Sequence, residues 1–329
     1  MTELIVFALL SFIIFFILAN LSYKLKLVDL PNQRKLHPNL TAYTGGLILS
    51  LIFLASIPLF NFSDSIFSLI ISSGFLVALI GFIDDEFNLN VGGKLSLQIF
   101  PIFYLIVFHE LALTHLGNYG YFEIQIVSFS LPLTLICVLF LINAFNYFDG
   151  LDGTVSFASL SVLLILHFLA HQELQILCFI IAIPLCVFLC FNFSLLKLPK
   201  LFLGDSGSLF LGFIISFILI YLAKHNIVHP ILLAWSIVIF VYEFISIHII
   251  RLRNDQHPFQ PGRDHLHHIL LEKSKSLFLT NLFITLGNLI LFSIGYMCFV
   301  LINPLASLVL FIFSFIIFFY LRNSIKAIF

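Results

Sequence analysis

The chain has 329 residues, of which 61% are hydrophobic and only 9% are charged. A soluble domain has roughly a quarter of its residues charged, so this composition excludes a soluble globular protein and predicts an all-α, polytopic membrane protein. The net charge of −1 gives no basic excess for a nucleic-acid partner, and five cysteines, all within apolar runs, indicate neither a disulfide framework nor a zinc site.

The apolar runs predict about eleven membrane-spanning helices in a single domain, residues 1–329. A spanning helix needs about 20 mostly apolar residues. No repeat or linker divides the chain. We expect helices at residues 4–22, 45–62, 66–83, 95–113, 129–147, 154–170, 174–192, 206–223, 229–250, 278–301 and 304–321.

The basic residues predict the orientation of these helices. When the loops are numbered alternately, all 15 lysines and arginines except Lys224 fall on one side. Cytoplasmic loops carry an excess of such residues, so we expect the N-terminus outside and the C-terminus in the cytoplasm. The clustered acids share the cytoplasmic side. Because acidic residues contribute little to orientation, these clusters need another explanation.

The first polar stretch is "DLPNQRKLHPNLTAYTGG", residues 29–46. Its basic cluster is typical of an orientation signal that also contacts anionic lipids. The paired Gly45 and Gly46, at the start of the second expected helix, predict close packing against a neighbour.

The second stretch, "GFIDDEFNLNVGGKLSLQ" at residues 81–98, joins the third and fourth expected helices. Asp84 and Asp85 are adjacent, and neighbouring carboxylates repel each other unless a cation or a proton lies between them. The pair therefore indicates metal binding or proton transfer, with a solvated helix end as the alternative. Lys94 fits either a phosphate-binding charge or a lysine that extends to the membrane interface.

The third stretch, "NAFNYFDGLDG" at residues 143–153, ends the fifth expected helix. Asn143, Asn146, Asp149 and Asp152 recur every three residues, which at helical spacing gives overlapping faces. Polar groups in a membrane are costly and usually functional, so we expect one line of oxygen ligands. For the two amides the alternative is hydrogen bonding between helices.

The fourth stretch, "LFLGDSGSLFLGF" at residues 201–213, precedes the eighth expected helix. Asp205 or Ser206 can cap the free N–H groups of that helix. The same N–H groups attract phosphate, so the stretch fits both a structural cap and a phosphate site.

The fifth stretch, "RLRNDQHPFQPGRDHLHHIL" at residues 251–270, has the prolines and glycine of a loop outside the membrane. Neutral histidines ligate metals and charged ones bind phosphates. Zinc is disfavoured because no cysteine or regular histidine spacing accompanies them. The candidate binding residues are Arg263, His265, His267 and His268.

Carboxylates, amide oxygens, cations and a helix N-terminus thus gather on one membrane face. Mg²⁺ prefers oxygen ligands and usually binds one or two protein side chains plus substrate phosphates. The combination predicts phosphoryl transfer, in which catalysis depends on positioning and charge neutralisation. A site at the membrane indicates that one substrate is a lipid.

The ordered motifs resemble the polyprenyl-phosphate N-acetylhexosamine-1-phosphate transferase family, a relative of the phospho-N-acetylmuramoyl-pentapeptide transferases. The match runs from "DLPNQRKLHP" through "DD", "NAFNYFDGLDG" and "GDSGS" to "GRDHLHHIL", in family order. It implies that undecaprenyl phosphate attacks the β-phosphorus of a UDP-N-acetylhexosamine and that UMP leaves, which initiates cell-envelope polysaccharides such as O-antigen. It also implies a bacterial inner-membrane enzyme with a cytoplasmic active site, and a homodimer as one assembly state.

The resemblance also implies a role for each motif residue. Asp205 and Asn146 would bind Mg²⁺, with Mn²⁺ as an alternative. Asp84 would deprotonate or orient the lipid phosphate, supported by Asp85, and Lys94 would hold a phosphate.

Two acids and one loop complete this implied site. Asp149 and Asp152 would shape the nucleotide or metal site. The loop would grip the sugar phosphate or diphosphate through Arg263, His265, His267 and His268.

The "HLHH" form is similar to the branch that uses UDP-N-acetylglucosamine. One departure is Glu243 in "FVYEFISIHIIRLR", where that branch usually has a proline and then an aspartate. That segment looks closer to the muramoyl-pentapeptide branch, whose activity stays an alternative. A transporter and an inactive lipid-binding scaffold are alternatives of other classes. As a membrane-embedded carboxylate, Glu243 is expected to face inward.

Overall fold

The computed structural model describes residues 2–29, 40–60, 62, 64–170, 172–258, 262 and 264–327. Within these ranges most residues are helical, and two short antiparallel hairpins complete the fold. The helices are α1 (Thr2–Lys24), α2 (Gly45–Phe60), α3 (Ser65–Phe87), α4 (Val91–Phe103), α5 (Ser130–Phe148), α6 (Thr154–Leu169), α7 (Gln172–Asn192), α8 (Gly204–Lys224), α9 (Pro230–Ser236), α10 (Val238–Arg253), α11 (Leu266–Ser274), α12 (Leu277–Leu301) and α13 (Pro304–Ala327). The hairpins pair β1 (Val28–Asp29) with β2 (Thr41–Ala42) and β3 (His115–Asn118) with β4 (Glu123–Gln125).

The helices confirm an all-α polytopic membrane protein. In the described part of the chain, eight helices are long and apolar enough to cross a membrane, and the bent pair α9–α10 makes a ninth if it is one span. The apolar helices α2 and α6 are shorter. Every expected span has a helix at its place, while the count of eleven and the orientation remain predictions.

The fourth expected span ends earlier than predicted. Its helix widens into a π-helical turn over Tyr104–Phe108, and the chain then leaves the helix toward β3. Pro101 lies three residues before this turn and supplies no N–H to the helical ladder. A proline in an apolar run therefore marked the point where regular α-helix is lost.

The ninth expected span is broken in the middle. Between Ser236 and Val238 the helix axis bends by 74°. The buried Asn288 of α12 satisfies the freed backbone groups: its Nδ2 donates to the Ser236 carbonyl (3.0 Å) and its Oδ1 accepts from the Ile239 N–H (3.3 Å). A side chain distant in sequence thus makes the break tolerable inside an apolar bundle.

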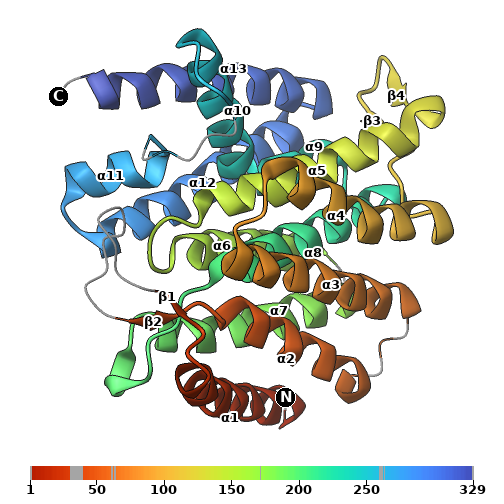
Figure 1. The fold of residues 1–329 in the computed structure, drawn as a ribbon. Helices are drawn as coiled ribbons and strands as arrows, with labels where there is room; N and C mark the ends of the chain where they lie inside the picture. Colours follow the sequence, from red (N-terminus) through yellow and green to blue (C-terminus); the bar gives the residue numbers. More distant parts are fainter. Residues whose placement is uncertain are drawn as a thin grey trace.

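Helix α8 is the core of the bundle. All its residues from Ser206 to Ala223 are buried except Tyr221. A helix that is apolar all round must be covered on every side. It contacts α2, α3 and α5, and runs through the middle of the bundle (Figure 1).

The starts of α2 and α8 lie against each other, as the paired glycines predicted. The Gly45 and Gly46 N–H groups donate to the carbonyls of Phe202 (3.0 Å) and Leu203 (2.8 Å). A Cβ on Gly46 would collide with the backbone of Gly207. The close-packing prediction is therefore confirmed.

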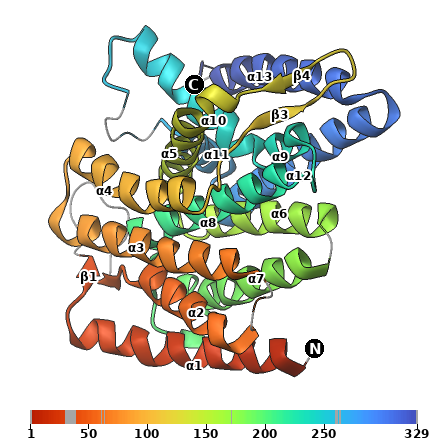
Figure 2. The ribbon, with the colours of Figure 1, turned by 90° about the vertical axis from the view of Figure 1, so that its right-hand side faces the viewer.

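The bundle has two distinct ends. Figure 2 shows the β3–β4 hairpin at the end where the N-terminus lies, with β1 at the opposite end. A bridge between Ala42 and Leu201 places the starts of α2 and α8 near β1. The polar helix ends that carry the predicted site residues meet there.

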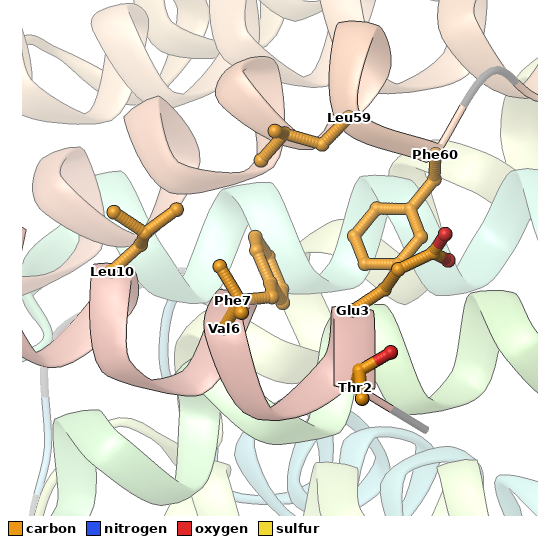
Figure 3. Close-up of a pocket in the computed structure, with 7 residues that line it drawn as sticks. All are labelled: Thr2, Glu3, Val6, Phe7, Leu10, Leu59 and Phe60. Atoms are coloured by element: carbon orange, nitrogen blue, oxygen red, sulfur yellow. The ribbon is translucent and has the colours of Figure 1, made fainter.

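An apolar pocket at the other end is separate from these residues (Figure 3). Between Gly46 and Leu59, α2 rises by roughly 20 Å at 1.5 Å per residue, so the pocket lies far from the start of α8. Its lining is Thr2, Glu3, Val6, Phe7, Leu10, Leu59 and Phe60.

Candidate active site

Three helix ends bring Asp84, Lys94 and Asp205 together. Asp84 lies in the last turn of α3, Lys94 in the first turn of α4 and Asp205 in the first turn of α8. The Lys94 ammonium lies 2.8 Å from Asp84 Oδ2 and also contacts the carboxylate of Asp205. Asp84 and Asp205 thus share one cation, although Lys94 and Asp205 are 111 positions apart in the chain.

Asp85 supplies the cap of α8 from a neighbouring helix. Its Oδ1 accepts from the Asp205 N–H (3.0 Å) and its Oδ2 from the Ser206 N–H (3.3 Å). These are among the N–H groups that a helix start leaves unpaired. The capping alternative for the fourth stretch is thus fulfilled by Asp85, and the side chain of Asp205 is left to face Lys94.

Gly204 makes this approach possible. Its backbone has a φ of +70°, which side-chain-bearing residues rarely adopt. An added Cβ would lie 2.6 Å from Asp85 Oδ2 and 2.7 Å from the Tyr43 carbonyl. The first glycine of "GDSGS" therefore admits the carboxylate of α3 to the start of α8.

The end of α5 adds Asn146 and Asp149 to the cluster. The Asn146 amide donates to Ser208 Oγ (3.0 Å) and is also a hydrogen-bonding neighbour of the Asp205 carboxylate. Removal from water, together with the negative charges of Asp205 and Asp152, raises the pKa of Asp149 well above its usual range.

The predicted single line of ligands from Asn143 to Asp152 is divided in the structure. Helix α5 ends at Phe148, so Asp149 and Asp152 lie beyond it and the three-residue spacing no longer places them on one helix face. Asp152 forms an ion pair with Lys200 (2.7 Å) and accepts from the Asn192 amide (3.3 Å). It interacts electrostatically with Asp149. The Asn143 amide donates to a carbonyl of its own helix, so it is not the interhelical hydrogen bond considered as an alternative.

The histidine segment, residues 264–268, packs against the turn after α5. The ring of His265 lies 5.2 Å from that of Tyr147, and the ring of His267 lies 6.0 Å from that of Phe148. A Cβ on Gly150 would collide with His267. Sequence-distant stretches three and five thus form one surface, while Arg263 lies outside the described residues.

Two of these histidines are neutral and have ring nitrogens without partners among the described residues, although Nε2 of His265 lies 3.5 Å from Arg251 Nη2. Burial lowers the pKa of His265 to about 3 and that of His267 well below its usual range. Among the described residues, neither ring nitrogen of His267 has a hydrogen-bond partner, nor does Nδ1 of His265. Buried polar atoms are normally paired, so these nitrogens are available to a ligand.

The cluster is chemically suited to a divalent cation. The carboxyl groups of Asp84, Asp85, Asp149 and Asp205 interact electrostatically around one ammonium, so they outnumber the cation. Among the described residues no three acidic, histidine or cysteine side chains form a complete metal cage. Carboxylate and amide oxygens are ligands that suit Mg²⁺, which keeps water and substrate phosphates in its shell.

Two contributing residues, Lys200 and Tyr43, were missed in the sequence. Lys200 lies four residues before Gly204, and this nearness of a base to "GDSGS" could have identified it. Tyr43 donates to the Glu86 carboxylate, and burial together with Glu86 raises its pKa, so it keeps its proton. In the sequence, the signal for Tyr43 was its position two residues before the paired glycines.

Comparison with known proteins agrees with this geometry. A family model described as glycosyl transferase family 4 matches residues 66–223, which contain every acid of the cluster. Similar proteins called undecaprenyl-phosphate alpha-N-acetylglucosaminyl 1-phosphate transferase occur in Escherichia coli (strain K12), 31% identical over 89% of this chain and 82% of that protein. Those of Yersinia pestis and Pasteurella multocida (strain Pm70) are each 30% identical over 89% of this chain and cover 83% and 85% of their own lengths.

Proposed function

This chain belongs to glycosyl transferase family 4, and we propose that it transfers N-acetylglucosamine-1-phosphate from UDP-N-acetylglucosamine to undecaprenyl phosphate, releasing UMP. The observation that carries the proposal is the cluster of Asp84, Lys94 and Asp205 at helix ends of a membrane bundle. The relatives' names favour N-acetylglucosamine over a muramoyl-pentapeptide donor and a transferase over a transporter.

The bond changes define what the site must do. An oxygen of the lipid phosphate forms a bond to the β-phosphorus of the donor, and the bond between that phosphorus and the bridging oxygen to the α-phosphate breaks. UMP leaves with the bonding electrons. The protein must therefore hold two anionic substrates in line and reduce the repulsion between them.

Asp84 and Lys94 suit the lipid phosphate. Asp84 Oδ1 accepts from the Leu89 N–H (2.8 Å) while Oδ2 faces Lys94, so the carboxylate is held in one orientation. From there it would orient or deprotonate the attacking phosphate, and Lys94 would contribute its charge to a phosphate oxygen. Asp85 would support both by fixing the start of α8.

Asp205 and Asn146 would hold Mg²⁺, for which Mn²⁺ is an alternative. When bound, the cation would offset the charge of the donor diphosphate and of the departing UMP. The excess of carboxylates supports this assignment. Asp149, with its raised pKa, would carry a proton toward the nucleotide side, and Asp152 with Lys200 would border that side.

The histidine segment would grip the sugar diphosphate. Each neutral imidazole of His265 and His267 has one N–H, which can donate a hydrogen bond to an anionic oxygen. We place the active site on the cytoplasmic face of a bacterial inner membrane, with O-antigen or a related polymer as the product's use. A homodimer is one assembly state that the resemblance implies.

A panel of UDP-sugars tests the proposal. Purified protein is incubated with undecaprenyl phosphate, Mg²⁺ and one of three donors: UDP-N-acetylglucosamine, UDP-N-acetylgalactosamine or UDP-N-acetylmuramoyl-pentapeptide. The lipid product is identified by mass spectrometry. We expect a lipid diphosphate carrying N-acetylglucosamine as the main product. A muramoyl-pentapeptide product would reassign the donor, and no UMP release with any donor and any divalent cation would reject the transferase.

A further inference from the structure

We propose that a buried ion pair, Glu243 with Arg322, positions the histidine segment and thereby sets the affinity for the UDP-sugar diphosphate. Glu243 lies on α10 and Arg322 on α13, far from each other in the chain. Neither residue belongs to the acidic cluster, so both are positioning residues. The inference rests on the proposed function because that function assigns the diphosphate to the segment.

The ion pair is fully buried and doubly bonded. Each residue is 1% exposed. Arg322 Nε donates to Glu243 Oε2 (2.6 Å), and Arg322 Nη2 donates to Glu243 Oε1 (2.8 Å). A two-point contact of this kind fixes orientation as well as distance. Burying two charges costs much of what their attraction returns, so stability alone is a weak reason for such a pair.

The same atoms also hold the backbone on both sides of His265. Glu243 Oε1 accepts from the Leu266 N–H (2.9 Å), which is the first N–H of α11. Arg322 Nη2 donates to the carbonyl of Asp264 (2.5 Å). His265 lies between these two anchored groups, so the pair holds the backbone on both sides of it, while Arg251 Nη2 lies 3.5 Å from its ring Nε2.

A second buried arginine anchors the segment from the other side. Arg251 of α10 donates from Nη2 and Nε to the Asp264 carboxylate (2.9 and 3.3 Å), and from Nη1 to the Pro258 carbonyl (2.7 Å). Burial acts to raise the pKa of Asp264, but the Arg251 guanidinium outweighs it and lowers that pKa. The carboxylate therefore stays ionised, and the segment is held at its backbone and its side chain.

This anchoring gives the unpartnered nitrogens a fixed place. The rings of His265 and His267 are nearly parallel, at 2° between planes, and lie against Tyr147 and the turn at Gly150. Among the described residues, neither nitrogen of the His267 ring has a hydrogen-bond partner. Its position therefore depends on ring packing and on the backbone of the segment, which Glu243 and Arg322 hold on both sides of His265.

The test removes both charges at once. The double variant Glu243→Leu with Arg322→Met replaces the buried pair with apolar side chains, a change that often leaves stability intact. We expect an unfolding temperature near that of the wild type and an unchanged KM for undecaprenyl phosphate. The KM for UDP-N-acetylglucosamine should rise about tenfold or more, because misplacing binding groups by an ångström is costly.

Two further variants keep the test interpretable. Tyr242→Phe removes a neighbouring α10–α13 hydrogen bond, from the Tyr242 hydroxyl to the Phe311 carbonyl (2.5 Å), without touching the segment, and should leave both KM values unchanged. Arg322→Lys keeps the positive charge but loses the two-point hydrogen bonding of the guanidinium to Glu243. It should raise the KM for the UDP-sugar by a smaller factor than the double variant does. If the double variant does not fold, Arg322→Lys carries the same comparison.

Amide hydrogen exchange provides a readout that needs no substrate. Exchange at residues 264–268 should be faster in the double variant and in Arg322→Lys than in Tyr242→Phe. Unchanged exchange, an unchanged KM for the UDP-sugar, or an equal loss for both substrates with lowered stability would each overturn the positioning role. If the wild type releases no UMP, the proposed function fails while the exchange comparison still decides the positioning.

Discussion

At the scale of single residues, the site depends on one cation among several anions. Lys94 contacts both Asp84 and Asp205, and Asp149 is protonated more readily than an ordinary aspartate because removal from water and the charges of Asp205 and Asp152 raise its pKa. Carboxylates this close together repel one another unless a cation or a proton lies between them. The protonation of each carboxyl group in the site therefore depends on the charges of its neighbours.

The first prediction concerns Lys94. Lys94→Gln should lower kcat by about a hundredfold or more, because a positioned charge that stabilises a transition state is lost. Steady-state UMP release measures the effect. Lys224→Gln is the matched control, since Lys224 lies at the far end of α8 and donates to the Glu110 carbonyl. Equal rates for the two variants would contradict the role of Lys94.

The second prediction concerns Gly150, where a Cβ would strike the His267 ring. Gly150→Ala should displace that histidine and raise the KM for the UDP-sugar severalfold. Gly287→Ala is the control because an added Cβ there meets no atom within 4 Å, and alanine in a helix is favoured over glycine by about 1 kcal/mol. Equal KM values for both variants would show that the contact has no effect on binding.

At the scale of elements, the candidate site and the contacts that support it lie at helix ends and helix breaks. The end of α3 caps the start of α8, and the turn after α5 supports the histidine segment. The break between α9 and α10 depends on an amide from α12. The first and the third of these contacts are hydrogen bonds, which have no replacement from water inside an apolar bundle.

The third prediction concerns that break. Asn288→Leu leaves the Ser236 carbonyl and the Ile239 N–H unpaired, which should destabilise the protein by about 1–3 kcal/mol. Thr285→Val is the control, because Thr285 donates only to a carbonyl of its own helix. Thermal unfolding in detergent compares the two variants. Equal unfolding temperatures would mean that water or a local rearrangement replaces the amide.

The element scale also shows what the sequence could predict. Apolar length placed a helix at each expected span, and paired glycines predicted the close approach of α2 and α8. The break at Ile237 could not be foreseen, because the run is apolar throughout and its stabilising partner, Asn288, is 49 residues or more away. Likewise, three-residue spacing predicted one line of ligands, but spacing alone does not reveal where α5 stops.

At the scale of the whole molecule, one buried helix organises the site. Because α8 is enclosed by α2, α3 and α5, its first turn lies where the ends of its neighbours converge. The motif order in the sequence predicted which residues would gather, and the family comparison agrees. The partners of Glu243 could not be predicted, because Arg322 belongs to the last helix and no local pattern links the two.

The fourth prediction concerns the two faces of the membrane. A cysteine in place of Tyr121, which is 86% exposed in the β3–β4 hairpin region, should react with an impermeant maleimide on intact cells. A cysteine in place of Asp255, beside the end of α10, should react only after permeabilisation. The reverse pattern would contradict the orientation that the basic residues predict.

The central claim is that the helix-end cluster around Asp205 catalyses the transfer. The most direct measurement is UMP release from UDP-N-acetylglucosamine and undecaprenyl phosphate by purified wild type and Asp205→Asn, across a magnesium titration. The account predicts cation-dependent release by the wild type and a loss of about a hundredfold or more in the variant, whose unfolding temperature stays close to that of the wild type. Undiminished release by a folded Asp205→Asn protein would contradict it.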